Sequence, residues 1–132
     1  MVPLIHILTS FIPFVFLFPF HNYLSFAFFI GSVLIDVDHY FWYVIRFKDF
    51  SVKKAYEYYL PENKPKREKD ILNIFHVWEF WILILALSFV HIIFLLILLG
   101  MIFHLTLDFI DLNVKKTYGA RAISYFYWLK RH

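Results

Sequence analysis

The chain has 132 residues, of which 61% are hydrophobic and 23% aromatic, while only 17% are charged. This apolar content exceeds the roughly 45–50% of ordinary soluble domains, which excludes intrinsic disorder and favours an integral membrane protein. The absence of cysteine excludes disulfides and thiolate zinc sites, and a net charge of +3 is too small to indicate nucleic-acid binding.

Two apolar stretches near the N-terminus predict the first two membrane spans. Residues 3–18 are expected to form a short helix that kinks at Pro13 and ends near Pro19. His21 is expected to be a plain turn residue, and residues 23–45 are long enough for a second span.

The apolar stretch in the second half of the chain is too long for one span. As a single helix, residues 71–110 would measure about 60 Å, twice the thickness of the hydrocarbon core. We therefore predict spans at residues 71–87 and 91–111, with a turn at residues 88–91 that no Gly or Pro marks. His91 is expected to be another turn residue.

The positions of the basic residues predict the orientation. All 13 Lys and Arg lie in two segments, residues 46–69 and 115–131. Four spans place both segments on the same side, and the positive-inside rule makes that side cytoplasmic, together with both termini. We therefore expect an all-α protein of the cell membrane, a single domain of residues 1–132 folded as a four-helix bundle.

Two segments outside the spans are expected to carry structure of their own. In the cytoplasmic loop of residues 46–70, residues 51–60 predict a short surface helix, and residues 61–70 a polar linker. The tail of residues 119–132 predicts a short helix lying on the membrane interface. Its apolar residues follow helical spacing: Ala122, Tyr125, Phe126 and Leu129.

Acidic and imidazole side chains interrupt the predicted spans. A charged residue at the centre of a membrane helix costs about 2.5–3.5 kcal/mol, so we expect a compensating role for each. They occur as Asp36-x-Asp38-His39, His76-x-x-Glu79 and His104-x-x-x-Asp108, with His6 in the first span. Counted at 1.5 Å per residue, all lie about 8–16 Å from the cytoplasmic rim, which places them in one layer of the predicted bundle.

This set of side chains predicts a metal centre. Imidazole and carboxylate ligands without thiolates suit zinc, and also manganese or iron. The set is too large for one tetrahedral ion, so we expect two zinc ions. The candidate ligands are His6, Asp36, His39, His76, His104 and Asp108, while Asp38 and Glu79 are candidates for a general base or for contacts to the ligands. A structural polar network and a proton or cation pathway are the alternatives.

The order of the motifs along the chain is also informative. A histidine near the N-terminus precedes Gly31-Ser-x-Leu34-x-Asp36-x-Asp38-His39, a further histidine opens the third span, and Gly100-x-x-x-His104-Leu-x-x-Asp108 follows. From about His6 to Leu112 this pattern resembles the YdjM-like membrane-bound metal-dependent hydrolases. More distantly, the Asp-x-Asp-His and His-x-x-x-Asp elements resemble the ligand runs of zinc-dependent phospholipase C. The resemblance implies metal-assisted hydrolysis and names no substrate.

Two positions depart from that family pattern. Ile35 stands where the family usually has Pro before its first Asp. Of the family's His-Arg-Gly-x-x-His-Ser motif, residues 71–77 keep only the last histidine, His76. Because the arginine is missing, the resemblance does not extend to the way the family binds phosphate.

The sequence thus predicts a membrane-embedded enzyme that hydrolyses an ester or phosphoester of a lipid or another amphiphile through metal-activated water. A metal or proton transporter and a non-catalytic membrane scaffold are the alternatives from other classes. A transporter needs polar residues continuing to the outer side, where only His21, Asn22, Ser88 and His91 are available. We expect the lipid bilayer as a partner and no nucleic acid; the sequence does not specify the substrate or the oligomeric state.

Overall fold

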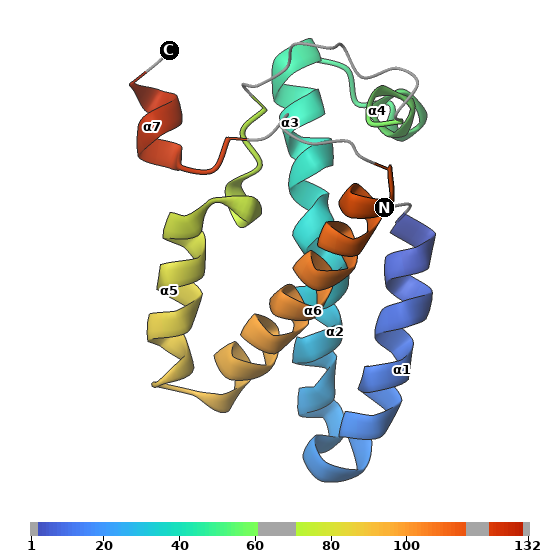
Figure 1. Ribbon diagram of the computed structural model, residues 1–132, viewed down its shortest axis with the longest axis vertical. Helices are drawn as coiled ribbons and strands as arrows, with labels where there is room; N and C mark the ends of the chain where they lie inside the picture. The colour runs from blue at the N-terminus through green and yellow to red at the C-terminus, as the bar shows by residue number, and fades with distance from the viewer. Residues whose placement is uncertain (1–2, 61–70, 116–121, 131–132) are drawn as a thin grey trace. The chain divides into compact units, whose positions relative to one another are not determined.

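The structure of the chain is a computed structural model, and it describes residues 3–60, 71–115 and 122–130 (Figure 1). The described residues are helical and contain no strand, as predicted. The helices are α1 (Pro3–His21), α2 (Ser25–Val33), α3 (Val37–Phe47), α4 (Val52–Tyr58), α5 (Trp78–Ser88), α6 (Ile92–Lys115) and α7 (Tyr125–Leu129), with 3₁₀ turns η1 (Asn22–Leu24), η2 (Leu34–Asp36) and η3 (Ile74–His76). The polar linker predicted at residues 61–70 lies outside the described residues.

The described residues form two compact units. The first unit lies within residues 1–35 and 81–118, and the second within residues 36–80 and 119–132. Each unit is described by itself below. The four-helix bundle and the single membrane domain stay predictions.

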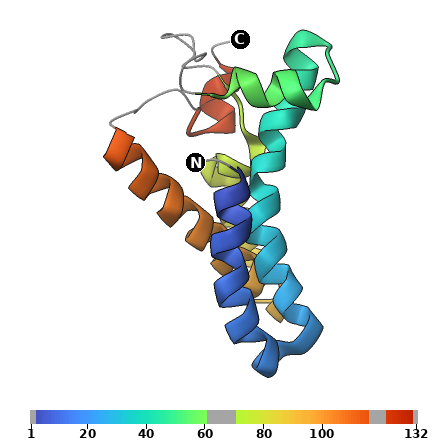
Figure 2. The same cartoon turned by 90° about the vertical axis from the view of Figure 1, so that its right-hand side faces the viewer.

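In the first unit, α1 and α2 run side by side in opposite directions (Figures 1 and 2). The predicted turn after His21 is confirmed, because Asn22 adopts a left-handed conformation with φ of 50°. The first helix extends beyond the predicted residue 18, because α1 includes both Pro13 and Pro19 and ends at His21. A proline removes one backbone hydrogen bond, whereas a left-handed residue takes the chain out of the helix, and asparagine tolerates that conformation.

Helices α2 and α6 approach each other closely at two glycines. A Cβ on Gly31 would lie 2.9 Å from the Cα of Ile97, and a Cβ on Gly100 would lie 2.9 Å from the backbone nitrogen of Ser32. Both distances are too short for any side chain, so only glycine allows this crossing. Ala27, Phe28 and Leu96 form a buried apolar cluster in the first unit.

The predicted break between the third and fourth apolar segments is confirmed, because α5 ends at Ser88 and α6 begins at Ile92. Polar side chains stabilise this turn. The Ser88 hydroxyl donates to the carbonyl of Leu85 at 2.6 Å, while the backbone of Val90 donates to Leu87. His91 then caps α6, because its Nδ1 accepts a hydrogen bond from the backbone of Ile93 at 3.1 Å. His91 is therefore a turn residue, as predicted.

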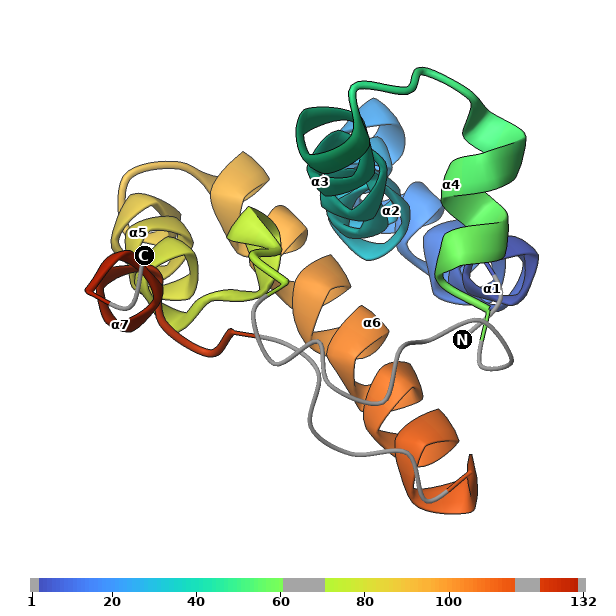
Figure 3. The same cartoon turned by 90° about the horizontal axis from the view of Figure 1, so that it is seen from above.

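In the second unit, α3 ends at Lys48, whose φ is 55°, and α4 follows after a short connection. Figure 3 shows α3 nearly end on and α4 from the side. The surface helix predicted at residues 51–60 is confirmed, and Ser51 caps it by accepting from the backbone of Lys54. The Lys54 ammonium donates to Asp49 at 2.8 Å; this hydrogen bond lowers the pKa of Asp49 and raises that of Lys54.

The prediction of a helix starting at residue 71 is wrong, because α5 begins only at Trp78. The preceding backbone finds partners elsewhere in the second unit. The Asp38 carboxylate accepts from the backbone of Phe75 at 2.9 Å. Ala122 donates to the carbonyl of Ile71, and Trp78 donates to the carbonyl of Ile123. These contacts give the backbone groups of residues 71–77 hydrogen-bond partners. The segment can therefore be irregular and still pay no penalty for unpaired backbone groups.

Two stretches, residues 6–47 and 92–111, are long and apolar enough to cross a membrane by length and composition. Much of their apolar surface is exposed. On α1, exposed side chains recur every four residues, at Leu8, Ile12, Phe16 and Phe20. Such a stripe lies on one face of a helix, and a lipid-facing helix needs an apolar face of this kind. α5 is apolar but has only 11 residues.

Candidate metal-binding groups

The second unit gathers one carboxylate and two imidazoles into a group that could hold a metal ion. Asp38, His39 and His76 each offer a ligand atom, and these atoms all lie within 4.8 Å of one another. The Asp38 Oδ1 atom lies 2.9 Å from His39 Nδ1, and its Oδ2 atom lies 3.0 Å from His76 Nδ1. Asp38 is only 4% exposed, so it needs such partners to be stable as a charge.

A break in the helix lets two aspartates serve this group. In a regular helix, Asp36 and Asp38 would point about 200° apart. The 3₁₀ turn η2 ends at Asp36, and α3 starts directly after it. Asp36 Oδ1 lies 3.4 Å from Nδ1 of His39, its i+3 neighbour, and 3.8 Å from His76 Nε2. The sequence offered two options for Asp38, a contact to the ligands or a break in the helix, and both are observed.

Asn73 belongs to the same surroundings, although it was not predicted as a site residue. It is fully buried, and its side-chain amide lies 3.1 Å from His39 Nε2. The Tyr59 ring packs edge-on against the His39 ring, with the two ring centroids 4.7 Å apart. The signal in the sequence was a lone amide inside an apolar run, where a buried polar group needs a partner.

A second group lies in the first unit and consists of His6, His104 and Asp108. The two imidazole rings stack with their centroids 4.0 Å apart. The carboxylate approaches both rings, with Asp108 Oδ1 at 3.3 Å from His6 Nε2 and Oδ2 at 3.7 Å from His104 Nε2. All three residues are buried. The sequence predicted all three as ligands, and the structure brings them together.

The hydrogen bond of His104 fixes which ring nitrogen carries its proton. His104 Nδ1 lies 2.8 Å from the carbonyl oxygen of Ser32. A carbonyl only accepts, so Nδ1 must donate, and a neutral ring then presents the lone pair of Nε2 to the Asp108 carboxylate. Two acceptors facing each other repel, unless a proton or a metal cation lies between them. Metal-binding histidines commonly show this pattern, with one nitrogen on the metal and the other on a carbonyl.

The helix crossing described above sets up this hydrogen bond. Gly31 and Gly100 let α2 and α6 approach closely, and this approach brings the Ser32 carbonyl, one residue after Gly31, to the His104 ring, four residues after Gly100. The Ser32 hydroxyl contacts the Ser10 hydroxyl, which lies one turn after His6 on α1. The glycines in the sequence motifs therefore have a packing role next to the predicted ligands.

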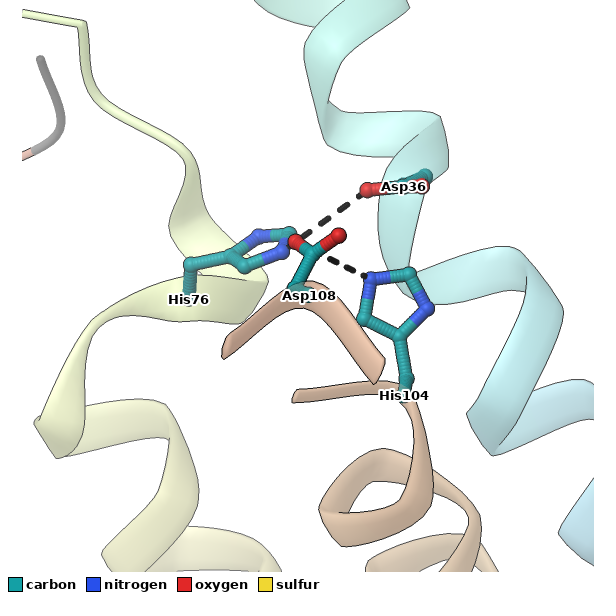
Figure 4. A group of neighbouring side chains, drawn as sticks. All are labelled: Asp36, His76, His104 and Asp108. Atoms are coloured by element: carbon teal, nitrogen blue, oxygen red, sulfur yellow. Dashed lines mark ion pairs between the residues drawn. The ribbon is translucent and has the colours of Figure 1, made fainter. Parts of the chain in front are cut away.

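Figure 4 draws one ion pair from each unit as a dashed line. Asp36 and His76 belong to the second unit, and His104 and Asp108 to the first. Five of the six predicted ligands fall in the two groups, Asp38 joins the group of the second unit, and Asp36 contacts the two histidines of that group.

Glu79, the remaining predicted site residue, has different surroundings. Its carboxylate accepts from the Ser124 hydroxyl at 2.5 Å and from the backbone nitrogens of Tyr125 and Phe126 at 3.1 and 3.3 Å. These are the first residues of α7, where a helix has unsatisfied N–H groups that favour a negative charge. The structure thus uses Glu79 to hold α7, and its role as a base stays a prediction.

We expect Glu79→Gln to loosen α7 and to leave metal content and hydrolysis unchanged. The amide keeps one acceptor oxygen instead of two, and losing such a cap costs about 1 kcal/mol, or roughly fivefold faster proteolysis of the tail. Limited proteolysis and elemental analysis measure the two effects, with Glu57→Gln on the exposed face of α4 as the matched control. A rate that falls by about 10²–10⁴-fold with the metal retained would instead make Glu79 the general base.

Comparisons with known proteins give no further support for a function. No protein-family model matches the chain, and no curated protein or solved structure matches it either. The resemblance to the YdjM-like hydrolases therefore stays a prediction from the motifs.

Proposed function

We propose that the chain is a membrane-embedded, metal-dependent hydrolase. The observation that carries the proposal is the Asp38, His39 and His76 group, whose ligand atoms lie within 4.8 Å of one another. Three protein ligands leave a coordination position open for water or substrate, which is the arrangement of catalytic rather than structural zinc sites. An ion held by these three residues would activate water and polarise the bond to be cleaved.

The group of the first unit supports a second ion. The Nε2 lone pair of His104 faces the Asp108 carboxylate, and a cation between them removes the repulsion. With both groups occupied the chain holds two ions. Nitrogen and oxygen ligands without sulfur favour zinc over copper(I), while manganese and iron are the alternatives.

The substrate class follows from the proposed location. The exposed apolar stripe of α1 and the apolar length of residues 92–111 support insertion in the bilayer. We propose four spans, with both termini and residues 46–70 in the cytoplasm, because all the basic residues lie in two segments that four spans place on one side. An ester or phosphoester of a lipid or another amphiphile can reach ligands carried by such helices.

Single cysteines test this topology, because the native chain has none. A cysteine in place of Lys53, on the exposed face of α4, is expected to react with a membrane-impermeant reagent only after the membrane is permeabilised. A cysteine in place of Phe89, in the exposed turn before α6, is expected to react with a membrane-impermeant reagent from outside. Labelling of both positions from the same side would contradict the four-span arrangement.

A hydrolysis screen tests the activity. Purified protein in detergent, loaded with zinc or manganese, is expected to cleave at least one class among phosphodiesters, phosphomonoesters, carboxylic esters and lipids. Removal of the metal with a chelator should abolish the activity, and adding zinc back should restore it. A fully metallated protein that is inert towards all four classes would contradict the proposal.

A non-catalytic scaffold is the second candidate, and one observation favours it. Asp38 accepts from the backbone of Phe75 as well as contacting His39 and His76, so it also holds the irregular segment before α5. For a scaffold, substitutions in the group lower the unfolding temperature and there is no activity to lose. The resemblance of the motifs to metal-dependent hydrolases favours the enzyme.

A further inference from the structure

The contact between Asn73 and His39 has a consequence for how a metal ion binds. The two nitrogens of the His39 ring have different neighbours. Nδ1 lies 2.9 Å from Asp38 Oδ1 and 3.4 Å from Asp36 Oδ1, while Nε2 lies 3.1 Å from the amide of Asn73. A nitrogen between two carboxylates is stable when it carries the proton. Without a metal ion, Nδ1 therefore donates to Asp38, and Nε2 accepts from the Asn73 NH₂ group.

In this state Nδ1 cannot bind a metal ion, because a ligand nitrogen must present its lone pair. Nδ1 is nevertheless the His39 atom that faces Asp38, and Asp38 in turn contacts His76. For a cation to take the place of the proton, the proton must leave Nδ1. A neutral ring then carries it on Nε2, which becomes a donor and needs an acceptor in place of the Asn73 NH₂ group.

Asn73 can supply that acceptor by turning its own amide. Rotation by half a turn exchanges the NH₂ group and the carbonyl oxygen in nearly the same volume, so that Oδ1 faces His39 Nε2. In the observed orientation, Oδ1 is buried and has no hydrogen-bond partner among the described residues. The rotation therefore breaks no hydrogen bond at that end of the amide. The His39 ring itself is packed edge-on against Tyr59 and His76, which favours movement of the amide over movement of the ring.

We propose that Asn73 is a positioning residue that switches the tautomer of His39 when a divalent cation binds at Asp38, His39 and His76. The proton moves from Nδ1 to Nε2 of the same ring, so the ring stays neutral and no proton is lost from it. The cation accepts the Nδ1 lone pair, and the Asn73 carbonyl accepts the new N–H. The inference rests on the proposed metal site and is independent of the reaction.

Nitrogen NMR of histidine-labelled protein tests the switch, with the His39 signal assigned by its loss in His39→Gln. In the wild type, we expect the proton on Nδ1 without metal and on Nε2 after addition of zinc. Asn73→Asp presents an acceptor in both orientations, so without metal both ring nitrogens should carry a proton, and after addition of zinc only Nε2 should keep one. Asn73→Leu offers neither donor nor acceptor and should weaken zinc binding by roughly 10–100-fold, as is usual for the loss of a partner behind a ligand.

Asn113→Asp is the matched control, because it makes the same change at an exposed amide on α6. It should leave the tautomer and the zinc affinity unchanged.

The inference is overturned if the wild-type proton stays on one nitrogen with and without zinc, if zinc does not bind, or if Asn73→Leu binds zinc as tightly as the wild type. If the switch is seen but no substrate is cleaved, the inference stands and the proposed reaction falls. If hydrolysis occurs and the Asn73 variants change neither tautomer nor affinity, the inference alone falls.

Discussion

Asp38→Asn is expected to remove the metal ion from the second unit and to abolish hydrolysis. The amide has nearly the shape of the carboxylate, and its oxygen can still accept from the backbone of Phe75, so the fold should survive. The variant loses the negative charge that a cation needs between His39 and His76. Loss of a residue that is hydrogen-bonded to a metal ligand already lowers metal affinity roughly 10–100-fold. Loss of the charge of a ligand itself should therefore lower it at least about 100-fold.

Elemental analysis and zinc titration measure this effect, and His76→Ala should reproduce it from another segment of the same group. His91→Ala is the matched control, because His91 lies in the turn before α6 and caps that helix. It should keep the full metal content. If Asp38→Asn and His76→Ala both retain the metal and the activity of the wild type, this group is not the catalytic site.

His104→Asn is expected to abolish metal binding in the first unit at a small cost in stability. The short amide places its NH₂ group near the position of the imidazole Nδ1, so it can still donate to the Ser32 carbonyl. It has no atom in place of Nε2 and cannot reach a cation beside Asp108. His104→Ala loses the hydrogen bond as well, and an unsatisfied buried carbonyl costs about 1–3 kcal/mol.

The pair of variants therefore separates a ligand from a structural residue. For a ligand, both variants lose the ion of the first unit, although His104→Asn unfolds at a clearly higher temperature than His104→Ala. For a purely structural histidine, His104→Asn keeps the metal and the activity, and only His104→Ala is impaired. Thermal unfolding in detergent, elemental analysis and the hydrolysis assay distinguish these outcomes.

Local patterns in the sequence predicted much of the fold. The break near Ser88 followed from span length, because an apolar helix is limited by the thickness of the bilayer, and the turn at His21 followed from its place after Pro19, between two apolar stretches. The residues that close these turns, Asn22 and His91, are polar and lie between apolar runs. Such features depend on neighbours in the chain and are therefore readable from it.

Contacts between distant residues could not be predicted in the same way. The irregular segment before α5 depends on a bond from Phe75 to Asp38, 37 residues away, and apolar periodicity contains no trace of it. Glu79 was assigned to the metal site because it follows His76 by three residues, yet it contacts Ser124, 45 residues further on. A charge in an apolar run shows that a partner exists, but its spacing does not identify the partner.

The candidate ligands were predicted better than their surroundings. Histidines and aspartates are unusual in apolar helices, and five of the six predicted ligands fall in the two groups, while Asp36 contacts the second of them. The Ser32 carbonyl and the Asn73 amide, which contact the rings of His104 and His39, were not predicted as partners of these rings. A backbone carbonyl carries no sequence signal, and a single asparagine has many uses.

The metal content of the purified wild-type chain tests the central claim most directly. Elemental analysis, after loading with zinc and removal of excess metal, should find two ions per chain. Asp38→Asn and His104→Asn should each retain one ion, and the double variant should retain none. A wild type that holds no zinc, manganese or iron after loading, or a double variant that holds as much as the wild type, would contradict the account.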